Sequence, residues 1–298
     1  MSLAADPETL GGWVLPNVVR LYTDRSLLDS PRPRPIQPMP TTTRQSIYDH
    51  PRFYDLLFAS DWRAEFDFLE GCFRDYAKRK VRRVFEPACG TGRLLVKLAG
   101  AGYRVAGNDL NPRAVEFCNK RLVRHGFPAS AMVADMADFR LSRPVDACFN
   151  TINSFRHLDS EQKALAHLRC VAEALAPGGL YVLGLHLTPE GKAECTEESW
   201  SARRGHLGVT SRMQTLDVDR RRRQERVAMT FDIYTPTKQM RLSEELIFRT
   251  YTAGQMRRLL AGVPELETAE TFDFAYDLEQ PVRVDGQSED TVFVLRRR

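Results

Sequence analysis

From Tyr48 onward, apolar and polar positions follow a pattern that predicts strands and helices in turn. Short apolar runs of strand length begin at Val81, Tyr103, Ser130, Val145 and Leu180. The segments between them carry apolar residues three or four positions apart, which is the spacing of an amphipathic helix. Alternating strands and helices predict a parallel sheet with helices on both faces. Two more runs, 267–276 and 290–297, bring the expected Rossmann-like α/β fold to a mostly parallel seven-stranded sheet.

The pattern changes after Trp200 and before residue 43. Three strand-like runs with no helix between them, 207–216, 226–235 and 241–250, predict a small antiparallel sheet inserted over residues 200–250. Near the start, "SPRPRPIQPMP" has proline at nearly every second position, which favours extended chain without amide donors. We therefore expect residues 1–42 to form an arm and Pro-rich linker, and residues 43–298 to form the main domain.

The stretch "VFEPACGTGRLLVKL", residues 84–98, runs from a strand through a glycine turn into a helix. Gly90 and Gly92 allow a ligand to approach the backbone, and the first helical amides offer free donors. Leu95 stands where a dinucleotide fingerprint has its third glycine, and no G-K-[ST] follows, which argues against a dinucleotide or a triphosphate. A carboxylate at Glu86 would repel pyrophosphate and attract a cation.

Two further acids follow the next two predicted strands. Asp109 stands where an acid accepts hydrogen bonds from ribose hydroxyls in nucleoside-binding α/β folds. Asp135 can accept a bond from an exocyclic amino group, with Met136 against the adenine face. Three acids at neighbouring strand ends suit a cationic nucleoside without phosphate, and S-adenosylmethionine meets this demand. The alternative is a purely structural role, in which the glycines form only a tight turn and the acids only cap helices or turns.

The segment 84–118, with "GNDLNP", "VADMADF" and "LAPGGLYVL", resembles class I S-adenosylmethionine-dependent methyltransferases. The resemblance covers residues 45–298 in order and spacing. It implies cofactor contacts from Tyr54, Trp62, Glu86, Ala88, Gly90, Gly92, Arg93, Asp109, Leu110, Asp135, Met136 and Asn150. It also implies that aromatic residues of "SIYDHPRFYDLLFASDW", among them Tyr48, close over the cofactor as an N-terminal lid. The alternative for these aromatics is an ordinary core.

The acceptor side is predicted from "FNTINSFRHL", residues 149–158. This stretch lacks the [DN]-P-P-[YFW] motif of enzymes that methylate exocyclic amino groups of adenine or protein glutamine. It resembles the S-x-x-H-L stretch of small-molecule methyltransferases, including those that act on aminosugars and other amines. His157 is the candidate catalytic residue, as a base or an acceptor-orienting group. The alternative is that His157 only caps or supports the next helix.

Composition narrows the remaining choices. The chain has 298 residues, a net charge of +4 and six cysteines with no C-x-x-C pair, which predicts reduced thiols in a cytoplasmic protein without a metal site. It shows neither a secretory signal pattern nor an apolar run long enough to span a membrane. The basic run 219–226 leaves an RNA methyltransferase as the runner-up, although acids within and beside it make a poor phosphate track. A non-catalytic nucleoside-binding or interaction protein is the third alternative.

Overall fold

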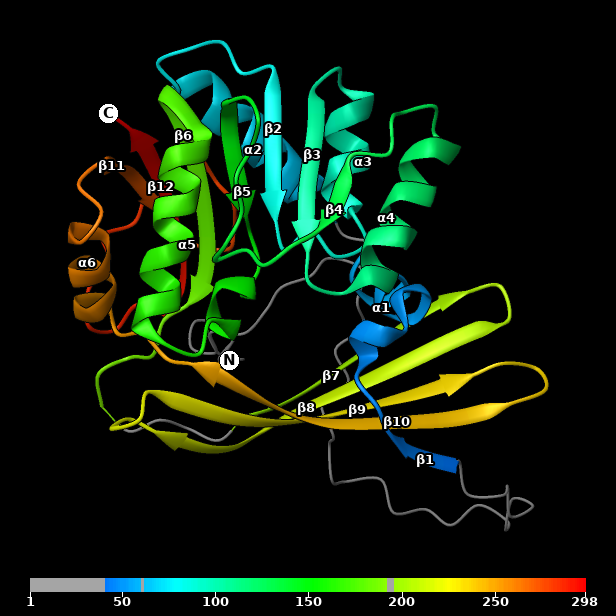
Figure 1. Cartoon of the computed structure of the whole chain (residues 1–298). Coiled ribbons are helices and arrows are strands. Elements are labelled where there is room, and N and C mark those ends of the chain that lie inside the picture. Colours follow the sequence, from blue (N-terminus) through cyan, green and yellow to red (C-terminus); the bar gives the residue numbers. More distant parts are fainter. Residues whose placement is uncertain (1–40, 60–61, 192–195) are drawn as a thin grey trace, which may run out of the picture.

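A seven-stranded sheet forms the centre of the computed structural model, which describes residues 41–59, 62–191 and 196–298 (Figure 1). The predicted arm, residues 1–42, lies outside the described residues except for its last two. The strands are β2 (Arg83–Pro87), β3 (Arg104–Asp109), β4 (Ala131–Val133), β5 (Val145–Asn150), β6 (Leu175–His186), β11 (Leu266–Phe272) and β12 (Asp290–Arg297).

The sheet order is β11-β12-β6-β5-β2-β3-β4, so the expected mostly parallel seven-stranded sheet is confirmed. Strands β2 to β6 are parallel, and β12 runs antiparallel to both β6 and β11. The chain order reverses between β2 and β5. Open α/β sheets bind ligands at such a switch point, outside the carboxyl ends of the strands.

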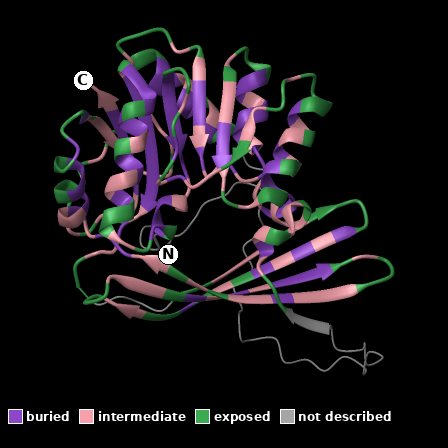
Figure 2. Cartoon of the chain, in the orientation of Figure 1, coloured by how far each residue is buried: buried purple, intermediate pink, exposed green. Residues whose placement is uncertain are grey.

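Helices cover both faces of this sheet, as the alternation within its strands requires. In β2, Val84 packs with helices α2 (Arg63–Asp75), α3 (Arg93–Gly100) and α4 (Pro112–Arg124). The next residue, Phe85, packs on the other face with α5 (Glu161–Ala174) and α6 (Ala253–Ala261). Figure 2 shows the central strands buried between these helical layers. The described helices include none that is long and apolar enough to cross a membrane.

His167 on α5 is fully buried in this core and makes the stability of the fold depend on pH. Its Nδ1 lies 2.8 Å from the carbonyl oxygen of Met136, and its Nε2 lies 2.7 Å from the hydroxyl of Tyr181. Burial lowers the pKa of His167 from 6.5 to about 4. On acidification the unfolded chain therefore takes up the proton first. The stabilising effect of the neutral ring is complete above pH 6.5 and is lost as the pH falls towards 4.

We expect the free energy of unfolding to fall by roughly 3 kcal/mol between these two pH values because of His167. Urea unfolding at a series of pH values measures this slope. A His167→Gln variant should be less stable at neutral pH but should lose less stability on acidification. Equal slopes for the two proteins would contradict the assignment.

A second sheet crosses beneath the first (Figure 1), and we call it the roof sheet. It comprises β1 (Thr41–Arg44), β7 (Glu197–Arg204), β8 (Leu207–Asp219), β9 (Gln224–Tyr234) and β10 (Gln239–Arg249), in the order β1-β10-β9-β8-β7. Strands β7 to β10 are antiparallel, which confirms the inserted antiparallel sheet. Two strands differ from the prediction. β7 begins before residue 200 and is mostly polar. β1, whose first two residues belong to the segment expected to be a linker, pairs parallel to β10.

The roof sheet packs through its inner face on a short helical segment that we call the lid, η1 (Ile47–Asp49) with α1 (Pro51–Phe58). Ile47, Leu56 and Leu57 of the lid form one buried cluster with Phe231 of β9 and Leu242 of β10. Phe231 and Leu242 are opposite each other in the register, and paired residues lie on the same face of a sheet. Helix η2 (Ser154–His157), which follows β5, also contacts β10.

Candidate cofactor and acceptor site

The glycine turn connects β2 to α3 in a backbone conformation that favours glycine. Gly90 has φ +53° and Gly92 has φ +68°, both in the left-handed region. A Cβ at Gly92 would lie 2.3 Å from the Sγ of Cys118, so this glycine allows the turn to pack against α4. A Cβ at Gly90 would meet no atom of the described residues within 4 Å. The turn therefore leaves open space beside Gly90, and the ligand contact expected of this glycine stays a prediction. Ala88 is also in the left-handed region, with φ +52°.

Asp109 ends β3 and faces this turn. Its Oδ2 accepts a hydrogen bond of 2.8 Å from the amide of Gly90, and its Oδ1 accepts one of 2.8 Å from the amide of Asn111. Burial raises the pKa of the Asp109 carboxyl, and the two amide bonds oppose this rise. Each carboxylate oxygen can accept more than one hydrogen bond, so this position retains capacity for ligand hydroxyls.

Two buried oxygen atoms near the turn have no hydrogen-bond partner among the described residues. One is Oε2 of Glu86 in β2, and the other is Oδ1 of Asn150 at the end of β5. The amide nitrogen of Asn150 donates to the carbonyl of Pro87 over 2.8 Å, which points the oxygen away from that strand. Burial raises the pKa of the Glu86 carboxyl well above its usual range. An unpaired buried acceptor is costly, so both atoms favour a ligand that carries donors.

Sequence reasoning did not find four residues that support the glycine turn: Asp55, Glu65, Thr91 and Arg121. Glu65 of α2 forms a buried ion pair with Arg93, which was predicted to contact the cofactor. The hydroxyl of Thr91 donates to Oδ1 of Asp55 in the lid over 3.1 Å, and Arg121 of α4 pairs with the same carboxylate. A buried carboxylate within an otherwise apolar helix face is the signal that was available for Asp55 and Glu65, which are 2% and 4% exposed.

The lid is attached to the strand ends by its backbone. Oδ1 of Asn111 caps α4, and its Nδ2 donates to the carbonyl of Tyr48 over 2.9 Å. The ring of Tyr48 lies 5.6 Å from the ring of Tyr54. Burial raises the pKa of Tyr54 to about 12; Arg93 opposes this rise, and the carboxylates of Asp109 and Glu86 add to it. Tyr54 therefore remains a neutral phenol among the predicted cofactor residues.

His157 faces the lid and the roof sheet. Its Nε2 lies 3.2 Å from the hydroxyl of Tyr48, and its ring packs edge-on against Phe248 of β10 with centroids 4.9 Å apart. Burial, and then the charge of Arg156, lowers the pKa of His157 to about 4. Although His157 packs against Tyr48 and Phe248, part of the residue is exposed to solvent, and the lowered pKa leaves the imidazole neutral at neutral pH. A neutral imidazole at this position has a lone pair that can accept a proton.

The predicted adenine-binding residues lie beyond β3 and β4. Oδ1 of Asp135 accepts a hydrogen bond of 2.8 Å from the amide of Ala137, so the side chain shapes its own turn. Met136 is only 8% exposed and packs in the core, which leaves a small part of its surface available to a base. Leu110 is 65% exposed at the end of β3. An exposed leucine beside Asp109 suits the open face of a bound base.

Trp62 immediately precedes α2, and its ring contacts residues of α2 and α3. Its ring has the guanidinium of Arg63 at 4.6 Å and the ammonium of Lys97 at 4.2 Å, and Phe66 packs edge-on against it. These contacts account for the position of the Trp62 ring on the surface of the helices. Its predicted cofactor contact stays a prediction.

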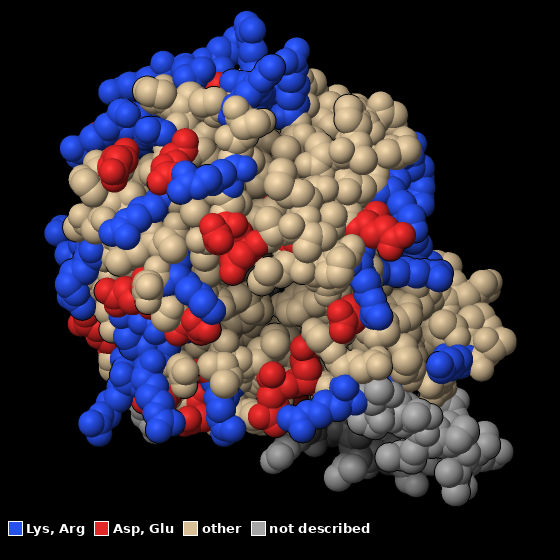
Figure 3. All heavy atoms as spheres, in the orientation of Figure 1, with Lys and Arg blue, Asp and Glu red and all other residues tan. Residues whose placement is uncertain are grey.

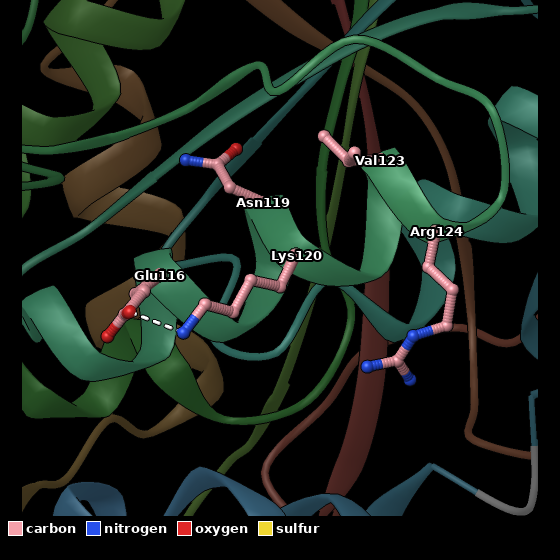
Figure 4. Close-up of a pocket in the computed structure, with 5 residues that line it drawn as sticks. All are labelled: Glu116, Asn119, Lys120, Val123 and Arg124. Carbon is pink, nitrogen blue, oxygen red and sulfur yellow. Dashed lines mark hydrogen bonds and ion pairs between the residues drawn. The ribbon is translucent and has the colours of Figure 1, made fainter.

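A shallow hollow on the outer surface of α4 is separate from these residues. Figure 4 shows that one face of the helix forms it, with Glu116, Asn119, Lys120, Val123 and Arg124. Glu116 and Lys120 form an exposed ion pair at 2.5 Å, and Asn119 donates to the carbonyl of Ala131 in β4. Because one exposed helix face forms this hollow and no polar group is enclosed in it, we do not assign the functional site to it.

The fold and the strand-end site define a class of protein. Residues 84–179 match the family model described as a methyltransferase domain. This confirms the resemblance predicted from the glycine turn and the acids that follow it. Over this segment, about a third of the chain, the protein is similar to methyltransferase domains.

Particular proteins similar to this chain include sugar N-methyltransferases. A dTDP-3-amino-3,4,6-trideoxy-α-D-glucopyranose N,N-dimethyltransferase from Streptomyces venezuelae is 29% identical over 145 residues, which cover 48% of this chain and 59% of that protein. The crystal structure of DesVI from Streptomyces venezuelae has a TM-score of 0.67 at 22% identity, covering 82% of this chain and 97% of the other. The sugar N-methyltransferase KedS8 from Streptoalloteichus sp. has a TM-score of 0.67 at 20% identity, covering 90% and 100%.

The extent of these similarities differs between sequence and structure. The chain spans less than two thirds of the length of the curated relatives that it matches. The likeness to the solved structures extends over most of both chains. At these identities the solved structures establish the fold.

Proposed function

We propose that this protein binds S-adenosylmethionine at the carboxyl ends of β2 to β5 and methylates the amino group of a small-molecule acceptor. One observation carries the proposal: the unpartnered buried oxygens of Glu86 and Asn150 lie at the strand ends that also present Asp109. This set accepts hydrogen bonds and includes two carboxyl groups whose ionised form a bound cation would stabilise, beside a glycine turn that is open at Gly90. It fits a cationic nucleoside and disfavours a pyrophosphate.

Each group has a role in holding such a cofactor. The oxygens of Glu86 and Asn150 would accept from its ammonium group, and Asp109 would accept from its ribose hydroxyls. Arg93, held by Glu65, would face its carboxylate. When bound, S-adenosylmethionine supplies a methyl group on a positively charged sulfur, which is activated towards attack by an amine.

The protein residues have two roles in this reaction: they align the acceptor, and they remove a proton from its amino group. An amine attacks only in its neutral form, so a nearby proton acceptor helps. His157 contacts Tyr48 and Phe248, and in this proposal its neutral imidazole takes the proton at a ring nitrogen. The lid and the roof sheet limit the access of water, which helps to fix the line of attack.

A small amine is favoured over RNA by the distribution of charge. In Figure 3, Lys and Arg side chains lie mostly towards the margins of the visible face, with acidic side chains interspersed. The basic run also differs from a free phosphate track, because Arg223 pairs with Glu161 at 2.6 Å and Arg220 donates to the carbonyl of Pro189. The amine acceptor agrees with the amino sugar named for the relative from Streptomyces venezuelae.

Calorimetry with S-adenosylhomocysteine tests the cofactor assignment directly. We expect binding by the full chain, and an affinity weaker by about 1 to 3 kcal/mol in Asp109→Ala, because the variant loses acceptors for ribose hydroxyls. Asp138→Ala is a matched control, since Asp138 follows β4 as an exposed acid. Binding of a nicotinamide dinucleotide without any binding of S-adenosylhomocysteine would refute the proposal. Unchanged affinity in Asp109→Ala would refute the ribose assignment alone.

A further inference from the structure

Two consecutive residues of η2 dock onto two paired residues of the roof sheet. Arg156 forms an ion pair with Glu225 of β9, while the neighbouring His157 packs on Phe248 of β10. Glu225 and Phe248 are directly opposite each other in the β9–β10 register, and the side chains of such a pair lie on the same face. Arg156 and His157, which are neighbours in η2, therefore contact two neighbouring side chains on one face of the roof sheet.

The ion pair is buried and has further partners. The side chain of Arg156 is 7% exposed and that of Glu225 is 19% exposed. Nε of Arg156 donates to the carbonyl of Arg249 over 3.1 Å, and its guanidinium carbon lies 5.2 Å from the centre of the Phe248 ring. Oε1 of Glu225 accepts from the hydroxyl of Thr215 over 2.9 Å. With these partners the guanidinium has little freedom to move, and Phe248 contacts both Arg156 and His157.

We propose that the Arg156–Glu225 ion pair is the positioning device for His157, because it locks η2 onto the roof sheet and fixes the imidazole between Phe248 and Tyr48. This inference rests on the role proposed for His157 and deepens it. Arg156 is a positioning residue that acts through its neighbour, and its fixed positive charge also favours the neutral imidazole.

The charged and titratable groups around His157 come from four elements. Tyr48 of η1 touches its Nε2, Arg156 precedes it in η2, Glu225 of β9 pairs with Arg156, and Glu244 of β10 acts on Tyr48. Removal of the positive charge of Arg156 should make His157 easier to protonate. Removal of the negative charge of Glu225 should have the opposite effect.

The chain offers a matched control for simple loosening of the interface. Arg223 also joins the roof sheet to the other layer, through its ion pair with Glu161 of α5 at 2.6 Å. It stacks on Tyr251, with 5.0 Å between the guanidinium carbon and the ring centre, as Arg156 does on Phe248. Within the described residues, the partners of the Arg223 side chain are Glu161, Tyr251 and the carbonyl of Thr250, and they do not include His157. A purely structural effect should therefore follow from either arginine, and a positioning effect only from Arg156.

The experiment is an NMR titration of the His157 imidazole in the full-length protein, with the signal assigned from a His157→Gln spectrum. In Arg156→Gln we expect the protonation midpoint to rise by at least half a pH unit. In Glu225→Gln it should stay at or below that of the parent protein, and in Arg223→Gln it should not change. Methyl transfer by Arg156→Gln should fall about tenfold with unchanged affinity for S-adenosylhomocysteine, and Arg156→Lys should recover part of it.

Several results would overturn the proposal. They are an unchanged midpoint in Arg156→Gln, an equal rise in Arg223→Gln, or a rise in both Arg156→Gln and Glu225→Gln, which is the sign of loosening alone. If Arg156→Gln fails to fold, Glu225→Gln and Arg156→Lys carry the test. The titration needs neither cofactor nor acceptor, so its failure is distinct from a failure to bind S-adenosylhomocysteine.

Discussion

Replacement of Gly92 by alanine is expected to destabilise the protein strongly, whereas replacement of Gly90 is expected to cost little stability and to weaken cofactor binding at least tenfold. Both positions have positive φ, so alanine costs about 1 to 2 kcal/mol of backbone strain at each. At Gly92 the new methyl group would also lie 2.3 Å from the Sγ of Cys118 and force α4 to move. Overpacking of this kind adds about 1 to 3 kcal/mol.

At Gly90 the new methyl group meets no atom in the part of the chain that the structure describes, and it projects into the space assigned to the cofactor. We expect Gly90→Ala to lose at least tenfold in affinity for S-adenosylhomocysteine, with a modest loss of stability. Thermal unfolding and calorimetry on both variants separate the two effects. A stable Gly92→Ala would contradict the packing against Cys118, and normal binding by Gly90→Ala would show that the open space lies outside the cofactor site.

His157→Ala is expected to lower turnover by at least tenfold while binding of S-adenosylhomocysteine is retained. General acid–base groups typically contribute factors of about 10² to 10⁴, and an orienting role contributes at the lower end. Initial rates with saturating cofactor and an amine acceptor measure the effect.

His125→Ala is the control, because this histidine caps α4 on the surface and contacts its own helix through the carbonyl of Arg121. Normal turnover in His157→Ala would refute the role of that histidine and leave the cofactor assignment standing. Tight, salt-sensitive RNA binding that disappears when residues 220–223 are neutralised would instead refute the small-molecule acceptor.

The parallel sheet was predictable because its information is local. Each strand is a short apolar run, and Asn111, Ser160 and Thr252 cap the helices that follow by hydrogen bonds within a few residues. The glycine turn and Asp109 were predictable for the same reason. Glycines in a turn and an acid at the end of the next strand occur at a fixed spacing in the sequence. Periodicity alone accounts for most of this layer.

Long-range polar contacts were beyond that reasoning. Asp55 and Thr91 are 36 residues apart, and Arg156 and Glu225 are 69 apart, so no local spacing connects them. Strand β7 escaped detection because its sequence "EESWSARR" is mostly polar, as a partly exposed edge strand tolerates. The face that Trp62 presents is likewise set by Lys97 on another helix.

The parallel pairing of β1 with β10 has a practical consequence for shortened versions of this chain. Strand β10 would otherwise end the roof sheet with a row of unpaired backbone groups, and β1 covers four residues of that row. Open strand edges invite pairing between molecules. A chain that starts at residue 41 keeps this cover, whereas one that starts at residue 45 exposes the edge directly beside the lid. The choice of starting residue therefore governs whether a trimmed protein remains dispersed at high concentration.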